Sequence, residues 1–154
     1  MTRIARLQFA LVPALMVTAI VVGLAAARKP EIYTFRGRVA LDGYDAVSYV
    51  SAGKPLRGRP ELEHRWKDAV WRFSTTENRD RFIEEPERYA PQFGGYCAYA
   101  VSKGYTASGD PLVWRIVDDR LYVNYSREAA RLWQEDIPGN IAKGRRNWPG
   151  VLGR

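Results

Sequence analysis

Two pairs of short apolar runs constrain the fold of this chain, because a two-residue polar turn separates the members of each pair. Residues 112–117 and 120–125 flank Asp118-Asp119, and residues 62–66 and 69–73 flank Lys67-Asp68. Two β-prone runs on either side of such a turn predict a β-hairpin. The sequence therefore predicts two hairpins, of which the one at Asp118-Asp119 has the stronger pattern.

A helix is predicted after each hairpin. Ser74 has Glu77 three residues later, a capping-box pattern that opens a helix running through Phe82. Ser126 is expected to cap a helix over residues 127–136. Hairpins alternating with helices predict an α+β fold: a small antiparallel sheet of hairpins with helices packed beside it.

Three further segments complete the prediction for residues 30–154, which are expected to form one domain. Pro138 suits the first position of a helix over residues 139–147. Residues 43–50, in contrast, are predicted to be extended after a glycine turn. No internal repeat is expected. The content of 46% apolar and 27% charged residues is that of a folded globular domain.

Residues 1–29 are predicted to be a signal peptide or a membrane anchor, with an apolar helix over residues 9–27. Arg3 and Arg6 precede this run, which is long enough to span a bilayer. It also ends in three alanines, the small-residue pattern of a signal-peptidase site. Both alternatives predict export to the periplasm or cell envelope. If the segment is not cleaved, it anchors the protein to the inner membrane.

The charge of the chain argues against a nucleic-acid-binding protein. The net charge is +7, but the basic residues are spread along the sequence, with one denser patch that contains Lys143, Arg145 and Arg146. A nucleic-acid-binding domain is expected to show a denser basic stripe and a recognisable reading motif. The patch instead suits the C-terminus of a helix, where cations complement the helix dipole, or contact with anionic lipid.

Residues 93–105 form the stretch expected to carry any small-molecule or metal site. It contains the only cysteine, Cys97, together with the glycine pair Gly94-Gly95 and three tyrosines. Adjacent glycines permit positive φ angles or a close backbone approach. In an oxidising compartment a single cysteine has no internal disulfide partner. Cys97 is therefore buried and inert, paired with another molecule, or used as a ligand or nucleophile.

Two segments together resemble the YHS domain family. These are residues 43–49, Gly-Tyr-Asp-Ala-Val-Ser-Tyr, and residues 71–89, which begin Trp-Arg-Phe-Ser-Thr-Thr-Glu-Asn. The resemblance extends over about residues 42–92, and residues 93–148 are similar to the extension of exported bacterial members. It implies a treble-clef-like core followed by a C-terminal hairpin and two helices.

The resemblance also implies heavy-metal binding by three cysteines, which this chain lacks. The corresponding positions hold Ser48, Ser74 and Asn78, which are poor ligands for a soft metal. A rebuilt site would have to use Cys97 and the only histidine, His64. Such a pair would hold copper or another soft metal ion, alone, with Asp or Glu oxygens, or with its copy in a dimer. The alternative is that Cys97 is a core residue and His64 a solvated strand residue.

A small-ligand pocket is the other predicted site. Tyr44, Asp45, Tyr96 and Tyr99 are expected to line one aromatic pocket with polar groups. The alternative is that Asp45 holds a turn through hydrogen bonds to backbone amides. The remaining large aromatic residues are predicted to lie in the core or between helices: Trp114, Tyr122, Tyr125, Trp133 and Trp148.

The sequence thus predicts a non-catalytic envelope protein that binds a soft metal ion or a small ligand near Cys97. The first alternative is an interaction module that contacts an envelope protein through exposed aromatic residues, with Cys97 structural. The second is a thiol-dependent enzyme with Cys97 as nucleophile and His64 as its base.

Overall fold

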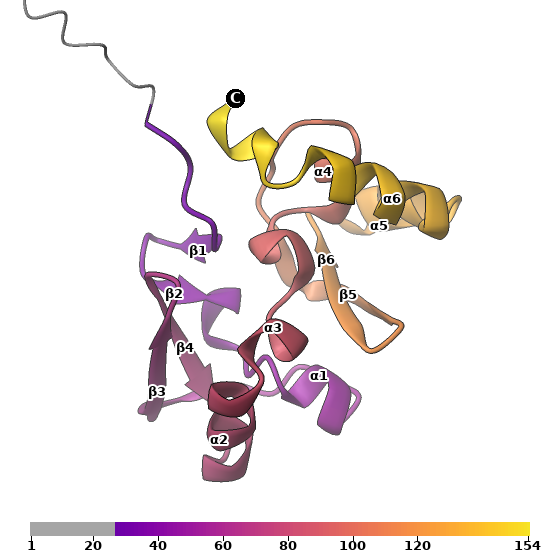
Figure 1. Ribbon diagram of the computed structural model, residues 1–154. Coiled ribbons are helices and arrows are strands. Elements are labelled where there is room, and N and C mark those ends of the chain that lie inside the picture. The colour runs from indigo at the N-terminus through magenta and orange to yellow at the C-terminus, as the bar shows by residue number, and fades with distance from the viewer. Residues whose placement is uncertain (1–26) are drawn as a thin grey trace, which may run out of the picture.

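The computed structural model describes residues 27–154 and has an α+β fold, as predicted (Figure 1). Residues 1–26 of the predicted signal peptide or anchor, which include all but the last residue of its apolar run, lie outside the described residues. Within residues 27–154, no helix is long and apolar enough to span a membrane.

Strands and helices follow one another along the described chain in two similar series. The strands are β1 (Thr34–Phe35), β2 (Val39–Ala40), β3 (Arg59–Trp66), β4 (Ala69–Phe73), β5 (Asp110–Val117) and β6 (Arg120–Asn124). The α-helices are α1 (Ser48–Ser51), α2 (Thr76–Glu84), α3 (Pro86–Tyr89), α4 (Ala98–Ser102), α5 (Arg127–Gln134) and α6 (Ile137–Asn147). Three 3₁₀ turns are η1 (Leu41–Gly43), η2 (Gln92–Gly95) and η3 (Gly150–Gly153).

The strands form two sheets rather than one antiparallel sheet. The larger sheet has the order β1-β2-β4-β3, and β5 and β6 form a separate two-stranded sheet. Val39 of β2 pairs with Val70 of β4 in a parallel arrangement. The purely antiparallel prediction is wrong at this pair, because the chain returns to β4 through a long connection and not through a tight turn.

Both predicted hairpins are confirmed. β3 pairs with β4 and β5 with β6, in each case antiparallel. All four residues of the turns Lys67-Asp68 and Asp118-Asp119 have positive φ, between 48° and 59°. Two consecutive residues of this kind define the type I′ turn, whose twist matches that of the flanking strands.

The predicted helix boundaries are correct to within a few residues, but residues 48–51 are helical and not extended as predicted. The backbone amide of Val47 donates to Asp45 Oδ1 at 2.9 Å, which turns the chain into α1. In α2 the N-cap is Thr75, which accepts from the amide of Asn78 at 3.1 Å, and not Ser74. Ser126 caps α5 as predicted, accepting from the amide of Ala129.

The described chain contains an internal structural repeat, contrary to the prediction. We call residues 41–89 the first unit and residues 92–147 the second unit; each runs from a 3₁₀ turn through a short helix and a hairpin to two helices. β3 and β5 have the same length, and their pairings shift register at equivalent places, between Arg59 and Glu63 and between Asp110 and Trp114. The N-caps Thr75 and Ser126 are also equivalent. Two short motifs also recur at equivalent places, Gly-Tyr-x-Ala at residues 43–46 and 95–98 and Gly-x-Pro at residues 58–60 and 109–111.

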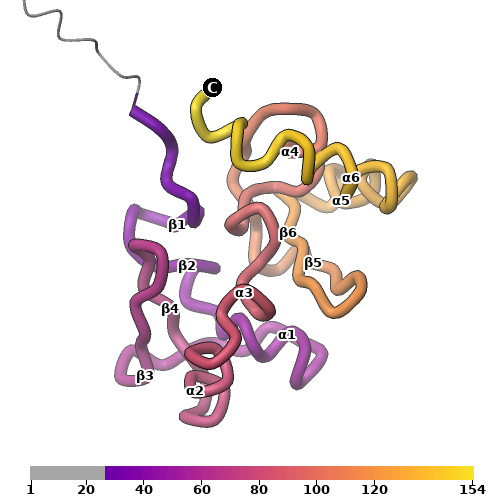
Figure 2. The backbone as a smooth tube through the Cα atoms, in the orientation of Figure 1, coloured from indigo at the N-terminus to yellow at the C-terminus, as the bar shows by residue number. Residues whose placement is uncertain are grey.

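The two units lie side by side and share their cores (Figures 1 and 2). Leu121 and Val123 of β6 are buried in the cluster that contains Phe73 and Phe82 of the first unit. A second cluster forms around Tyr122 and Trp133. Tyr33 from the N-terminal segment and Trp148 from the C-terminal segment pack against it. β6 therefore contributes alternate side chains to both cores.

The N-terminal end of the described chain runs along the second unit to the C-terminus (Figure 2). The amide of Lys29 donates to the carbonyl of Leu152, and that of Tyr33 to the carbonyl of Gly94, each at 2.8 Å. Gly94 has a φ of +62°, and a Cβ there would collide with the carbonyl oxygen of Glu31. Glycine at this position thus permits the N-terminal segment to pack against η2.

Candidate functional site

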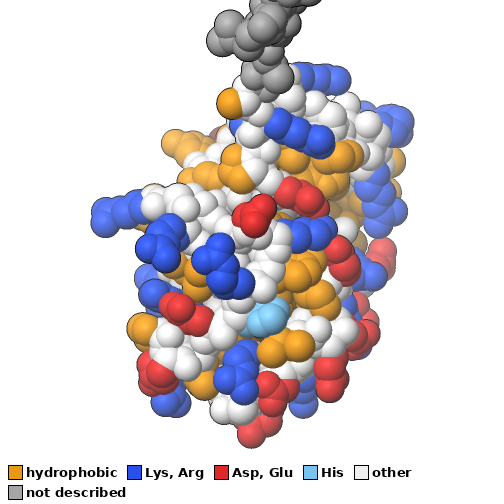
Figure 3. All heavy atoms as spheres, turned by 60° about the vertical axis from the view of Figure 1, so that its left-hand side comes forward, with side chains coloured by type: hydrophobic (Ala, Val, Ile, Leu, Met, Phe, Trp, Pro, Cys, Tyr) orange, Lys and Arg blue, Asp and Glu red, His pale blue; other side chains and the backbone are white. Residues whose placement is uncertain are grey.

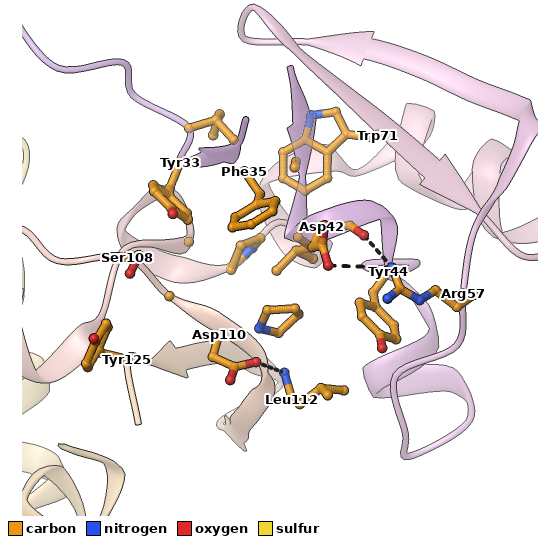
Figure 4. A pocket seen from close by; sticks show the side chains of 18 residues that line it. Tyr33, Phe35, Asp42, Tyr44, Arg57, Trp71, Ser108, Asp110, Leu112 and Tyr125 are labelled. Atoms are coloured by element: carbon orange, nitrogen blue, oxygen red, sulfur yellow. Dashed lines mark hydrogen bonds and ion pairs between the residues drawn. The ribbon is translucent and has the colours of Figure 1, made fainter. Parts of the chain in front are cut away.

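A cavity of about 310 Å³ opens where the two units meet the N-terminal segment (Figure 4). Its wall combines η1 and Arg57 of the first unit with residues 108–112 of the second unit and with β1. Small-molecule sites are concave, mostly apolar and commonly of this volume or larger. We refer to this feature as the inter-unit cavity.

The inter-unit cavity has a buried apolar floor and an exposed apolar rim. Ile32, Ala40, Leu41 and Trp71 form the floor, and each has at most 7% of its surface exposed. The rim residues Phe35, Leu112 and Tyr125 are 49%, 59% and 61% exposed. Outside the cavity lining, the only other exposed large apolar residues in the described chain are Ile83 and Tyr105, at 46% and 53%. The exposed apolar surface is therefore concentrated at the cavity.

Three charged side chains line the cavity, and two of them neutralise each other. Arg57 Nη1 donates to the carbonyl of Asp42 at 2.6 Å and lies 3.7 Å from Asp42 Oδ2. Its guanidinium carbon lies 4.0 Å from the centroid of the Tyr44 ring, a cation–π distance. Asp110 Oδ1 accepts from the amide of Leu112 at 2.8 Å, and Asp110 has no ion pair within the part of the chain that the structure describes.

The second-unit wall is fixed by a hydrogen bond from the first unit. The hydroxyl of Tyr49, on α1, donates to the carbonyl of Pro111 at 2.9 Å. Burial raises the pKa of Tyr49, with smaller contributions in the same direction from Tyr44, Asp110 and Asp45. The neutral phenol therefore persists across the physiological pH range, and it holds Asp110 and Leu112 in place at the cavity.

Of the four residues predicted to form a ligand pocket, only Tyr44 lines the inter-unit cavity. The Tyr96 hydroxyl donates to the carbonyl of Pro30 at 2.8 Å, and its ring packs against Tyr33 and so helps to hold the N-terminal segment. Tyr99 lies beneath the ammonium group of Lys103 at 4.9 Å. The structure thus does not gather these tyrosines around one ligand.

Asp45 is fully buried, and all its hydrogen bonds are structural. Its carboxyl oxygens accept from the amide of Val47, the amide and hydroxyl of Ser74, and Nδ2 of Asn78, at 2.6–2.9 Å. Ser48 donates to the Asp45 carbonyl. The three positions at which the YHS resemblance implies cysteine are thus grouped around Asp45: Ser74 and Asn78 bond to its carboxyl group and Ser48 to its backbone carbonyl. This network satisfies a buried polar group and leaves no ligand position open to solvent.

Cys97 occupies the position in the second unit that Asp45 occupies in the first. The amide of Asp45 donates to the carbonyl of Leu56, and the amide of Cys97 to that of Ala107, each at 2.9 Å. Cys97 is 1% exposed, and its Sγ lies 3.5 Å from Oδ1 of Asn124. Asn124 also accepts from the amide of Tyr99. These contacts are those of a buried thiol, and Asn124 rather than the Cys97 side chain accepts from the first turn of α4.

His64, in contrast, is half-buried on β3, and part of its side chain is visible on the face shown in Figure 3. It pairs with Trp71 across the hairpin, and its ring centroid is 6.4 Å from that of Phe82. Among residues 27–154, no group of three or more His, Cys, Asp or Glu side chains is placed to hold a metal ion. The described residues therefore do not build a three- or four-ligand metal site. A site made by Cys97 and His64 alone, or across a dimer, remains a prediction.

Most of the cavity residues are not predicted from the sequence. Tyr125 is predicted to lie in the core, but β6 ends at Asn124 and the Tyr125 side chain lies at the rim. Arg57 lies in the loop before β3. Asp110 and Leu112 lie at the start of β5, more than 60 residues after Tyr44 in the sequence. No local pattern distinguishes Leu112, because it begins the apolar run 112–117 of the predicted hairpin.

Comparisons with known protein families, with curated proteins and with solved structures find no match for this chain.

Proposed function

We propose that this protein binds a small organic molecule with an apolar body in the inter-unit cavity, without catalysing its conversion. The observation that carries the proposal is the exposed apolar rim, Phe35, Leu112 and Tyr125, above a buried apolar floor. Exposed apolar surface costs free energy in water, and gathered at a concave site it is typical of a ligand-binding surface.

The proposal of binding without catalysis is supported by the arrangement of reactive groups. The only thiol is buried beside Asn124 and is not part of the cavity lining. The only histidine lies on β3, outside that lining. The cavity itself offers aromatic rings, one arginine already paired with Asp42, and the carboxylate of Asp110. These groups suit recognition of a ligand rather than a nucleophile–base pair.

Titration with a neutral fluorescent probe, N-phenyl-1-naphthylamine, tests the proposal. We expect saturable fluorescence enhancement with the wild-type chain and binding weakened about threefold to tenfold in Leu112→Ala and Tyr125→Ala, because each change removes apolar contact area. Both side chains are mostly exposed, so neither change should unfold the protein.

The matched controls are Ile83→Ala and Tyr105→Ala, which remove exposed apolar side chains outside the cavity lining. These two variants should bind the probe as the wild type does. Equal losses in all four variants, or no saturable binding, would contradict the proposal.

A second candidate function is docking of a protein partner on the same rim, in line with the prediction of an interaction module. It is favoured by the exposure of Leu112 and Tyr125, because a site that encloses a small ligand completely would not need such exposed side chains. Pull-down with the Leu112→Ala and Tyr125→Ala variants separates the two: loss of a partner without loss of probe binding supports docking.

We also propose that the protein is exported and that its first unit is a YHS-like, treble-clef-like domain. The convergence of Ser48, Ser74 and Asn78 on Asp45 supports the second part. Copper binding by Cys97 and His64 stays a separate proposal, tested by Cu(I) titration beside Cys97→Ser. An alkaline phosphatase fusion after residue 154 tests export.

A further inference from the structure

We propose that the ligand of the inter-unit cavity carries a positive charge, as an amine or a quaternary ammonium group. This inference rests on the proposed binding function and specifies the class of ligand. It comes from the combination of aromatic rings with one carboxylate that has no cationic partner among the described residues.

Aromatic rings make up a large part of the cavity wall. Tyr33, Phe35, Tyr44, Trp71 and Tyr125 all line it (Figure 4). The faces of aromatic rings attract cations, and rings arranged around a pocket are a known means of binding quaternary ammonium groups. Two of these rings already have cations over them, since Arg36 lies 5.3 Å from the Phe35 centroid and Arg57 lies 4.0 Å from that of Tyr44.

The charged side chains of the lining are two carboxylates, Asp42 and Asp110, and one cation, Arg57. Arg57 and Asp42 form an ion pair, which cancels one charge of each sign. The carboxylate of Asp110 is then the one charge of the lining without an ion-pair partner. It is half-buried, and its Oδ1 accepts from the amide of Leu112. A carboxylate next to an apolar floor is stabilised by a cation brought close to it, because water screens the interaction less in a partly buried site. A cationic ligand would supply that charge.

The arrangement also indicates where the ligand would lie. Residues 110–112 form one side of the cavity, and Trp71 and Phe35 lie on the opposite side (Figure 4). A compact ammonium group can therefore approach Asp110 while its methyl or methylene groups contact the rings. An anionic ligand would instead have to separate Arg57 from Asp42 and lie beside Asp110.

Three probes of nearly the same shape test the charge preference. They are choline, its neutral carbon analogue 3,3-dimethyl-1-butanol, and the anion 3,3-dimethylbutyrate. Binding is measured by calorimetry and by displacement of N-phenyl-1-naphthylamine from the full chain. We expect choline to bind about tenfold or more tightly than the neutral alcohol, although the alcohol is more apolar. The anion should bind most weakly of the three.

Two variants assign that preference to the cavity. Asp110→Asn keeps the oxygen that accepts from Leu112, so the loop is retained, and it should bring choline close to the affinity of the alcohol. Arg57→Gln removes the cation that occupies the Tyr44 ring and should tighten choline binding. The control Asp68→Asn makes the same charge change in the β3–β4 turn, outside the cavity lining, and should leave all three affinities unchanged.

The outcomes separate this inference from the proposed function. Equal binding of choline and the alcohol, tightest binding of the anion, or a choline preference that Asp110→Asn leaves intact would overturn the cationic ligand. In each of these cases the probe titration with Leu112→Ala and Tyr125→Ala still decides the proposed function independently. A choline preference lost only in Asp110→Asn, with Asp68→Asn unchanged, would support the inference.

Discussion

The hydroxyl of Tyr49 connects the two units at the cavity wall, and its protonation should influence stability at high pH. Burial raises the pKa of this phenol above its ordinary value near 10. In the unfolded chain it ionises above pH 10, whereas in the folded chain it keeps its proton. The contribution of Tyr49 to stability is therefore complete below pH 10 and decreases as the pH rises above 10.

Replacing Tyr49 with phenylalanine should reveal both effects. At pH 7 we expect Tyr49→Phe to lower the free energy of unfolding by about 1 kcal/mol, because the hydrogen bond to Pro111 is lost. Above pH 10 the variant should lose stability less steeply than the wild type. Urea unfolding at pH 7 to 11 measures this. Some alkaline loss will remain, because burial also raises the pKa values of Tyr96 and Tyr122. Identical slopes in the two proteins would contradict the prediction.

At the scale of elements, the network around Asp45 connects η1, α1, β4 and α2. We expect Asp45→Asn to destabilise the protein by about 3 kcal/mol or more, because an amide NH₂ would face the donors of Ser74 and Asn78. Thermal unfolding followed by circular dichroism measures the loss.

The equivalent position in the second unit supplies the matched comparison. Cys97→Ser makes a similarly small change beside Asn124, where a hydroxyl can still donate to Oδ1. It should cost about 1 kcal/mol, so the two variants differ clearly. A loss for Asp45→Asn no larger than that for Cys97→Ser would show that the network contributes little.

Local sequence patterns predicted the elements that local interactions determine. The turns Lys67-Asp68 and Asp118-Asp119 and the cap Ser126 act within a few residues, and these predictions are confirmed. Local patterns do not predict helix α1, because it has a single turn and its start depends on Asp45, which is held by Ser74 and Asn78 far along the chain. They do not predict the cavity for the same reason, since its walls come from segments that only the folded chain brings together.

At the scale of the whole molecule, the interleaved cores predict that neither unit folds alone. A fragment of residues 27–91 would lack Leu121 and Val123, which complete the first core. We expect this fragment to show little near-ultraviolet circular dichroism and no cooperative melting, whereas residues 27–154 unfold in a single transition. A fragment with a cooperative transition of its own would contradict the shared core.

The hydrogen bond between Lys29 and Leu152 has a practical consequence for rearranging the chain. Because the start and the end of the folded body are neighbours, a short glycine-serine linker can join residue 27 to residue 154 without crossing the molecule. New termini can then be opened at Asp118-Asp119, an exposed turn at the end of a hairpin. Such a circular permutant would keep every strand and helix of the folded body. A fluorescent reporter at the new terminus would lie at the tip of the β5–β6 hairpin, whose β5 strand begins at the cavity.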